Sequence, residues 1–436
     1  MSEGGITVKD RKISFGNIPV SDLGKKYSTP LLVFSEQRII DNFKAFSKAF
    51  KKNYKNSQIY FSVKTNFETQ VLKTLVKLGS NAEVASSLEV KLAQKAGFKP
   101  EQIVLDGPAW TDNDMEYCID QGIHTFNVDS VDMLHRLHKI AKKKKKTVRI
   151  GFRVYPEVKM SILKTFVENF ISKFGVPISK ALDAYKEAQQ LDYIEITSMH
   201  AHIGSMITDP SYYEKAIAAM VKLAGDIKEQ LGIELKDINI GGGYGVQSLN
   251  YFSIQNIILS KAGISTYKKA ASIDEFATRI TNAFKKSQEI AGLKNLNLVL
   301  EPGRFIVSDA GILITKIVSV KPKWIFLDGG INIVPESLFF IRRGFMVDGK
   351  VGLPKDKKYG VAGPTLSTPD ILADAQEFQD VEVGDTVVVL DAGAYTLPRS
   401  TQFTMLRPNA MYVTKDKKVK YLRKAEKHED FMKNLL

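Results

Sequence analysis

Residues 58–85 read QIYFSVKTNFETQVLKTLVKLGSNAEVA. Gln58–Val63 and Ala82–Ala85 are short apolar runs, typical of buried strands. Between them, Val71, Leu75 and Leu78 recur at the spacing of one helix face. A strand, a helix and a second strand in this order predict two parallel strands joined by a crossover helix.

The same alternation continues on both sides of this stretch, over residues 30–306. Further apolar runs that we expect to be strands are Leu31–Phe34, Ile103–Leu105, His124–Val128, Val148–Val154, Ser198–Ile203, Ile238–Ile240 and Leu296–Leu300. No glycine-rich pyrophosphate turn occurs near the start, so a (β/α)8 TIM barrel is favoured over a doubly wound sheet. We therefore place an α/β barrel at residues 30–306.

The pattern changes after residue 307, where strands follow one another with few helices. The predicted strands there are Ile312–Val320, Trp324–Leu327, Glu382–Val383, Thr386–Leu390, Met411–Val413 and Val419–Tyr421. Gly5–Phe15 is also strand-like and could pair with these C-terminal strands. Residues 1–29 and 307–436 are thus predicted to form a second, mostly β domain.

The chain of 436 residues carries 62 Lys and Arg against 48 Asp and Glu, a net charge of +14. Such a balance suits nucleic acid, an anionic membrane or an anionic small molecule. No basic-aromatic repeat favours nucleic acid, and Lys142–Lys146 is typical of a solvated helix end. The single Cys118 excludes an internal disulfide. Without a long apolar run or an apolar signal segment, we expect a cytoplasmic protein with no membrane span.

Several predicted strands end in chemically active residues. Lys64 follows the first strand of the opening stretch, where partial burial would lower the pKa of its amine and make it nucleophilic. Taken alone, the position favours an ordinary surface lysine. His200 and His202 stand two apart and could be a metal pair or ordinary core histidines. No third ligand lies close to them in sequence, so no metal site is predicted.

Three further segments could bind an anion. Gly241–Gly243 can present successive backbone amides to a phosphate, although a flexible turn is the alternative. Arg304 suits a bidentate phosphate and Glu301 could hold a protonated ring nitrogen, or the two could simply pair with each other. Tyr395 is a plausible phosphate or hydroxyl partner, or a packed tyrosine in a turn.

The order of these segments resembles the fold-type III pyridoxal-phosphate-dependent decarboxylases, the family of ornithine, diaminopimelate and arginine decarboxylases. The segments that carry the resemblance are VKTN at 63–66, SKFG at 172–175, HAHIGS at 200–205, GGGYG at 241–245, EPGR at 301–304 and DAGAYT at 391–396. The resemblance implies an alanine racemase-like barrel with a β domain, pyridoxal 5'-phosphate as cofactor, and a head-to-tail homodimer with shared active sites.

The resemblance also implies roles for individual residues. Lys64 would form the covalent link to the cofactor, His202 would stack on its ring, and Glu301 would pair with its ring nitrogen, which makes these three the expected catalytic residues. Glu83 stands where the family has an acid near the lysine, and Glu89 matches a family acid on the next helix. The phosphate would be held by Ser205, Gly241, Gly242, Gly243, Arg304 and Tyr395.

Two stretches depart from the family pattern. In residues 363–370, GPTLSTPD, Leu366 replaces the cysteine that donates a proton to Cα and Ser367 replaces the acid that contacts the distal ammonium of the substrate, while Asp370 remains. In residues 335–343, Arg342 and Arg343 follow an apolar run where relatives place an acid.

The sequence therefore predicts a lyase that removes the α-carboxylate of an amino acid. The two departures favour an anionic substrate, an N-acylated diamino acid such as N-citrylornithine from the siderophore branch of the family, contacted by Ser367, Asp370, Arg342 and Arg343. The alternatives are a decarboxylase of a free amino acid of the diaminopimelate or ornithine type, an amino-acid racemase, and an inactive regulatory homologue.

Overall fold

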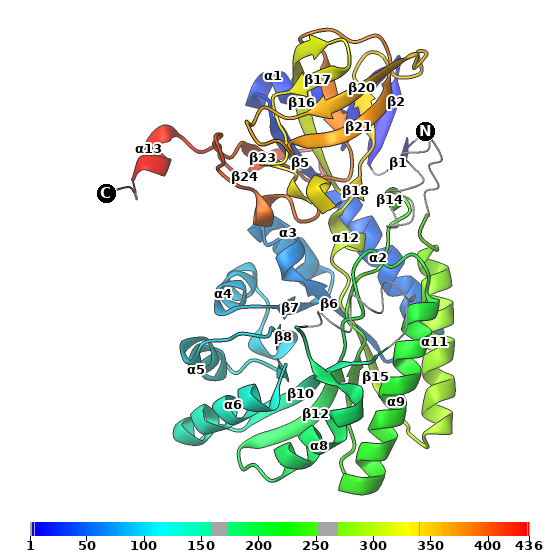
Figure 1. Cartoon of the computed structure of the whole chain (residues 1–436), viewed down its shortest axis with the longest axis vertical. Coiled ribbons are helices and arrows are strands. Elements are labelled where there is room, and N and C mark those ends of the chain that lie inside the picture. Colours follow the sequence, from blue (N-terminus) through cyan, green and yellow to red (C-terminus); the bar gives the residue numbers. More distant parts are fainter. Residues whose placement is uncertain are drawn as a thin grey trace. The chain divides into compact units, whose positions relative to one another are not determined.

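The computed structural model describes residues 2, 3, 5–157, 173–251, 269–339, 341–433 and 435 (Figure 1). The chain divides into two compact units. One comprises Met1–Asn42, Val246–Lys269 and Arg304–Leu436, and the other comprises Phe43–Gly245 and Ala270–Gly303. Within the described ranges, no helix is long and apolar enough to cross a membrane. Ser172 of the SKFG segment lies outside the described residues.

Eight parallel strands close into a barrel in the second unit, as the sequence predicts. In order around the barrel they are β6 (Ser57–Ser62), β7 (Asn81–Val84), β8 (Ile103–Asp106), β9 (Thr125–Val128), β10 (Val148–Tyr155), β12 (Ile194–His200), β13 (Asp237–Asn239) and β15 (Asn297–Leu300). The pairing of β15 with β6 closes the ring. The short strand β11 (Val176–Pro177) pairs in parallel with the carboxyl end of β10.

Helices alternate with these strands and cover the outside of the barrel (Figure 1). They are α3 (Thr69–Lys77), α4 (Ser87–Ala96), α5 (Asp112–Gln121), α6 (Val131–Lys144), α8 (Ile178–Gln189), α9 (Ser211–Leu231) and α11 (Ile273–Ile290). Side chains of Ser86, Ser130 and Ser272 cap the starts of α4, α6 and α11 by accepting backbone hydrogen bonds. These caps fix where each helix begins, and therefore the length of the loop that follows each preceding strand.

The first unit contains a mixed sheet in the order β21-β20-β17-β16-β5-β23-β24, in which β22 also pairs with β16, and β19 pairs with β22. The strands are β5 (Leu31–Ser35), β16 (Gly311–Lys321), β17 (Trp324–Leu327), β19 (Phe345–Val347), β20 (Lys357–Ala362), β21 (Ile371–Phe378), β22 (Thr386–Val389), β23 (Asn409–Val413) and β24 (Val419–Arg423). Strands β20 and β21 were not predicted from the sequence. The predicted strand Glu382–Val383 is wrong, because these two residues lie outside any strand.

Strand β5 differs from its prediction, because it belongs to this sheet and not to the barrel. It pairs antiparallel with β16 and parallel with β23. Every residue of β5 is buried, and a fully buried strand has the same apolar composition in a barrel as in the centre of a mixed sheet. Only the pairing partners distinguish the two. The helix that follows, α2 (Glu36–Asn53), carries the chain from one unit into the other.

The N-terminal strands also differ from their prediction. They are β1 (Ser2–Glu3), β2 (Ile6–Lys9), β3 (Lys12–Phe15) and β4 (Ile18–Pro19), and they form a separate four-stranded antiparallel sheet. Asp10 and Arg11, with φ of 48° and 64°, form the tight turn that pairs β2 with β3. This sheet packs its apolar side chains, such as Ile13 and Phe15, in one core with Met411 of β23.

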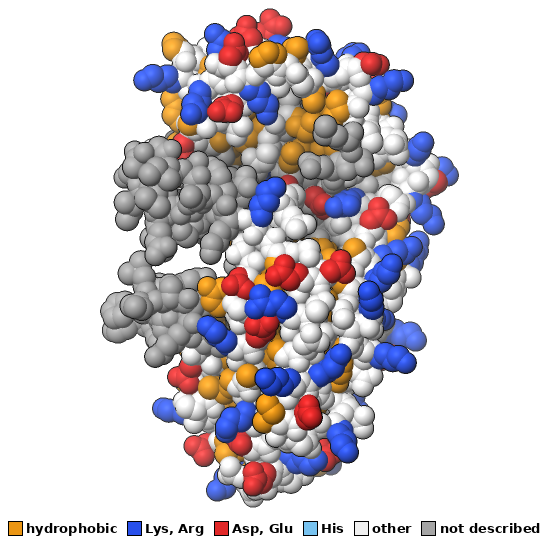
Figure 2. Space-filling view, turned by 90° about the vertical axis from the view of Figure 1, so that its right-hand side faces the viewer, with side chains coloured by type: hydrophobic (Ala, Val, Ile, Leu, Met, Phe, Trp, Pro, Cys, Tyr) orange, Lys and Arg blue, Asp and Glu red, His pale blue; other side chains and the backbone are white. Residues whose placement is uncertain are grey.

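Basic and acidic side chains are intermingled over the face shown in Figure 2. The lysines at the end of α6 follow this pattern, since Lys142 pairs with Asp192, Lys144 with Asp120 and Lys143 with Glu116. These pairs are largely exposed and contribute little stability each. The lysine run is therefore a solvated helix end, as the sequence indicates.

Candidate active site

The carboxyl-terminal ends of the barrel strands carry a set of polar side chains. In strand order they are Lys64, Glu83, Asp106, Asp129, Arg153, His200, Asn239 and Glu301, each at the end of its strand or just beyond it. Because the strands are parallel and the barrel is closed, their carboxyl ends meet at one rim. The fold thus brings these side chains together from eight separate segments.

Lys64 and Glu83 form the closest charged pair of this set. The Lys64 Nζ atom lies 2.6 Å from both carboxylate oxygens of Glu83. Glu83 is fully buried, whereas the Lys64 side chain is 41% exposed. Burial raises the pKa of Glu83 to about 7, and the Lys64 ammonium opposes this rise. Glu83 therefore holds the amine at the rim while the amine stays accessible.

Glu89, the acid on the following helix, has a local role. Its carboxylate accepts a hydrogen bond of 2.7 Å from the backbone amide of Ala85. Its own amide donates to Ser86 Oγ, the cap of α4. Burial raises the pKa of Glu89. Glu89 thus fixes the turn between β7, which carries Glu83, and α4.

Glu301 follows β15 and is held on two sides. Asn239 Nδ2 donates a hydrogen bond of 2.6 Å to Glu301 Oε1, and His200 Nε2 lies 3.5 Å from Oε2. Burial alone would raise the pKa of Glu301, but His200 and Lys64 together outweigh burial and lower the pKa below its ordinary value. Asn239 Oδ1 also accepts from the Gly241 amide at 2.9 Å. One asparagine therefore connects the buried carboxylate to the glycine loop.

The glycine loop is packed too tightly for any side chain. Gly241 and Gly243 have φ of 70° and 94°, which favours glycine. A Cβ on Gly242 would collide with the Glu301 carbonyl oxygen, and one on Gly243 would collide with that of Gly204. Among the described residues, the Gly242 and Gly243 amides donate no hydrogen bond. The loop therefore has the geometry of a backbone cradle with donors available to an anion.

The segment that carries His202 and Ser205 is fastened to this loop. Ile207 donates through its amide to the Gly243 carbonyl at 2.8 Å, and Gly245 donates back to Ile207. Burial lowers the pKa of His202 to about 3, so its imidazole is neutral. A neutral imidazole suits stacking on an electron-poor ring. Ser205 is exposed next to the loop.

Arg304 and Tyr395 belong to the first unit and have partners there. Arg304 Nη1 and Nη2 each lie 2.7 Å from an oxygen of Glu336, a buried bidentate pair. The guanidinium carbons of Arg304 and Arg399 lie 5.1 and 4.8 Å from the centre of the Tyr395 ring. In the part of the chain that the structure describes, Glu301 contacts Asn239 and His200, and Arg304 contacts Glu336, whereas the sequence allowed Glu301 and Arg304 to pair with each other. Each residue has a different partner.

The predicted substrate residues have varied environments in the first unit. Asp370 is buried, and its carboxylate accepts hydrogen bonds from the Ile331 amide and from the amide and hydroxyl of Thr365. It therefore stabilises its own loop, and its contact with substrate stays a prediction. Ser367 is half-buried in that loop, and the neighbouring Leu366 is 93% exposed.

The two consecutive arginines, which the sequence assigns to the substrate, are described to different extents. Arg343 is buried, with Nη2 3.5 Å from Glu336 Oε2 and Nε 3.2 Å from the Asp391 carbonyl oxygen. It thus belongs to the same ionic cluster as Arg304 and takes a structural role. For Arg342 the structure describes only the backbone, which pairs with Asn250 in the short β14–β18 ladder of Asn250–Tyr251 and Ile341–Arg342.

Sequence inspection missed several residues of the site. Those without a predicted role are Asp106, Asp129, Arg153, Asn239 and Glu336. All except Glu336 share one signal, a polar residue at the carboxyl end of an apolar strand. Arg153 illustrates it, since its Nη1 donates to Asp106 at 3.1 Å and its guanidinium lies 4.5 Å from the Phe174 ring centre.

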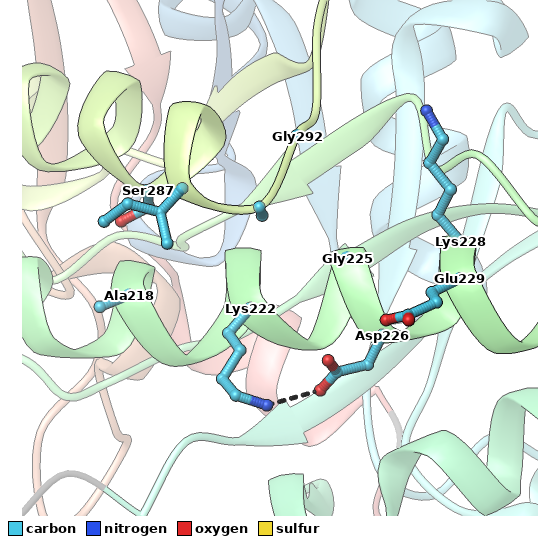
Figure 3. A pocket seen from close by; sticks show the side chains of 10 residues that line it. Ala218, Lys222, Gly225, Asp226, Lys228, Glu229, Ser287 and Gly292 are labelled. Atoms are coloured by element: carbon cyan, nitrogen blue, oxygen red, sulfur yellow. Dashed lines mark hydrogen bonds and ion pairs between the residues drawn. The ribbon is translucent and has the colours of Figure 1, made fainter.

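A pocket on the outside of the barrel lacks such chemistry. It lies between α9 and α11, where Lys222 pairs with Asp226 at 2.8 Å and Lys228 and Glu229 are the other charged side chains (Figure 3). These residues sit on exposed helix surfaces, and no buried polar side chain is aimed into the pocket. The chemically equipped region of this unit is the rim of the barrel.

The residues of this rim fit pyridoxal phosphate. Lys64 offers an amine for its aldehyde, the Gly242 and Gly243 amides suit its phosphate, and Glu301 is a buried carboxylate able to pair with a protonated ring nitrogen. The fold and these groups define a class of barrel enzyme in which a lysine amine binds the cofactor.

The chain belongs to the pyridoxal-dependent decarboxylase family, because the model of that family's pyridoxal-binding domain matches residues 36–308. It is 30% identical to a diaminopimelate decarboxylase of Methanothermobacter thermautotrophicus over 98% of this chain and 96% of that protein. The Aquifex aeolicus diaminopimelate decarboxylase is 31% identical over 97% and 95%. The crystal structure of the M. jannaschii enzyme with L-lysine superposes with a TM-score of 0.88 at 26% identity, covering 100% of this chain and 99% of that one.

These findings confirm a decarboxylase that acts on an amino acid with pyridoxal phosphate as its cofactor. When bound, the cofactor accepts the electron pair left at Cα as CO2 departs. The predicted siderophore branch receives no support, since the similar proteins are diaminopimelate decarboxylases. The alternative of a free amino acid as substrate fits them better.

Proposed function

We propose that this protein decarboxylates an unmodified diamino acid of the diaminopimelate type. The main support is the extent of the similarity to diaminopimelate decarboxylases, which spans nearly the full length of both chains. In the reaction the bond from Cα to the carboxylate breaks, CO2 leaves, and a proton replaces it at Cα. The product is a diamine or, from diaminopimelate, an amino acid.

The rim of the barrel supports roles for the predicted cofactor residues of the barrel unit. Lys64 binds the aldehyde carbon, Glu83 orients the amine, and His202 stacks as a neutral ring. Glu301 holds the proton at the ring nitrogen as an ionised carboxylate, which the lowered pKa of this group favours. Ser205 and the amides of the glycine loop hold the phosphate. Phosphate binding by Arg304 and Tyr395 stays a prediction.

We also propose a homodimer in the cytoplasm. Leu366 is a large apolar side chain at a loop tip with 93% of its surface exposed. An apolar side chain this exposed is more favourable when a second copy covers it. The family resemblance assigns this loop to the partner's active site, where Leu366 cannot donate a proton to Cα.

The test is CO2 release from meso-diaminopimelate, lysine, ornithine, arginine and N-citrylornithine by the purified holoenzyme, with Lys64→Ala as the inactive control. We expect kcat/KM for diaminopimelate to exceed that for N-citrylornithine by at least roughly tenfold, because a distal ammonium and carboxylate are recognised by charge-assisted hydrogen bonds. Preference for N-citrylornithine would refute the substrate assignment. Loss of optical activity without CO2 release would instead indicate a racemase.

A further inference from the structure

His200 is buried between two carboxylates at the barrel rim. Its Nδ1 lies 3.3 Å from Asp106 Oδ1, and its Nε2 lies 3.5 Å from Glu301 Oε2. The exposed fraction of His200 is 0%, and those of Asp106 and Glu301 are 7% and 3%. Both contacts have ion-pair distances, and neither imidazole nitrogen has a hydrogen-bond partner of regular geometry among the described residues. Attraction between a charged imidazole and the two carboxylates, more than directional hydrogen bonding, therefore relates these three side chains.

The charges around this group favour a protonated imidazole. Asp106 also contacts Arg153, at 3.1 Å, whereas the described contacts of Glu301 include no arginine or lysine within ion-pair distance. Burial alone would lower the pKa of His200, but Asp106 and Glu301 outweigh it and raise that pKa to about 9. Lys64 and Glu83 from neighbouring strand ends also act on these carboxylates.

His202, two residues further along, has the opposite charge state. Arg153 and Lys64 act on it in the same direction as burial, so its pKa is lowered to about 3. The contrast follows from the charged groups around each imidazole, which are carboxylates for His200 and include Arg153 and Lys64 for His202. A charged His200 and a neutral His202 can then perform different tasks within one HAHIGS segment.

We propose that His200 and Asp106 are positioning residues for Glu301. Asp106 orients the His200 imidazole and keeps it protonated, and His200 in turn keeps Glu301 ionised with its Oε2 atom fixed. Asn239 fixes the other oxygen, Oε1, at 2.6 Å. The inference rests on the proposed function only in that Glu301 then faces the ring nitrogen of the cofactor.

The first experiment measures protonation directly in the wild-type protein, both with and without cofactor. Two-bond 1H–15N spectra of the six histidines should show one imidazole that stays charged at pH 8. His200→Gln should remove that signal, and Asp106→Asn should move its titration to lower pH by at least about one unit. A neutral His200 at pH 7 in the wild-type protein would overturn the proposal, even if every variant failed to fold.

The second experiment measures kcat against pH. In His200→Gln, loss of the neighbouring positive charge raises the pKa of Glu301, so the acid limb of the profile should move to higher pH by about one unit. Asp106→Glu, which keeps a carboxylate beside His200, should leave the acid limb near its wild-type position. His124→Gln is the matched control, because His124 precedes β9 at the opposite end of the strands. Folded variants that lose kcat with an unmoved acid limb would refute the positioning role.

The two proposals fail in different ways. If the wild-type protein releases CO2 from no amino acid tested, the proposed function is wrong. The charge state of His200 still decides the inference about Asp106, His200 and Glu301 in that case, because the spectra require no turnover.

Discussion

The Lys64 ammonium lies 2.6 Å from both oxygens of the buried Glu83 carboxylate, on the neighbouring strand β7. Strands β6 and β7 pair in parallel, with Ser62 opposite Glu83, so the lysine two residues later reaches the acid across the rim. This contact holds the amine while 41% of the lysine side chain remains exposed.

Lys64→Ala should abolish CO2 release and leave the fold intact, because the covalent link to the cofactor is lost. The absorbance band of the bound cofactor in the near-visible region should disappear, and borohydride should no longer attach the cofactor to the protein. Lys73→Ala on α3 is the control. Near-normal CO2 release by Lys64→Ala would contradict the role of this lysine.

Glu301→Gln should keep the cofactor bound and lower kcat by roughly 100-fold or more, the range seen when a group that controls a proton is removed. The glutamine can still accept a hydrogen bond from Asn239, but it no longer holds a proton at the ring nitrogen by its charge. Steady-state kinetics with a separate measurement of cofactor occupancy test this. An unchanged kcat at full occupancy would show that Glu301 does not act on the ring nitrogen.

Gly243→Ala should raise the Kd for pyridoxal phosphate by roughly tenfold or more, since lost hydrogen bonds to a charged group cost that much. The added Cβ would collide with the Gly204 carbonyl oxygen, and the φ of 94° disfavours alanine. Gly292→Ala is the control, because its φ of 63° imposes a similar backbone penalty with open space around the Cβ. Equal Kd values for the two variants would argue against the loop as the phosphate cradle.

Asp391→Asn should stabilise the protein increasingly as the pH rises. Burial raises the pKa of Asp391 from 3.8 to about 6, so the folded protein binds more protons than the unfolded chain between these values. Stability contributed by the protonated group is therefore lost as the pH rises through about 6, on the order of 3 kcal/mol in total. Asparagine never bears this charge.

Thermal unfolding from pH 4 to pH 8 measures that effect as the difference in Tm between Asp391→Asn and wild type. The difference should grow from pH 4 to about pH 7 and then level off. The asparagine can keep accepting from the Ser248 and Ser308 hydroxyls, which both contact Asp391 Oδ1. A Tm difference independent of pH would show that Asp391 is ionised throughout this range.

Ser367→Glu should improve kcat/KM for a free diamino acid by about tenfold or more, because a carboxylate would form a charge-assisted hydrogen bond to the distal ammonium. It should weaken N-citrylornithine turnover by like-charge repulsion. Ser367→Gln separates charge from size. If Glu and Gln have the same effect on both substrates, this loop position does not read the charge of the substrate.

The sequence by itself determined the barrel and the chemical character of its rim. Alternating strand and helix periods are local properties, and a polar residue after an apolar strand marks the rim without knowledge of its neighbours. Lys64 and Glu301 could be singled out in this way, whereas Glu83 was implied only by the resemblance to known decarboxylases. The resemblance to known decarboxylases added the cofactor, which the family comparison then confirmed.

Only the tertiary structure decided which strands and charges became partners. β5 has the composition of a barrel strand but pairs with β16 and β23. Arg304 could have paired with nearby Glu301, yet it contacts Glu336, and His200 lies between Asp106 and Glu301 from distant strands. Apolar periodicity encodes which face of a segment is buried. Ion pairs and strand neighbours depend on distances in space, which are set only when the barrel closes and the sheet forms.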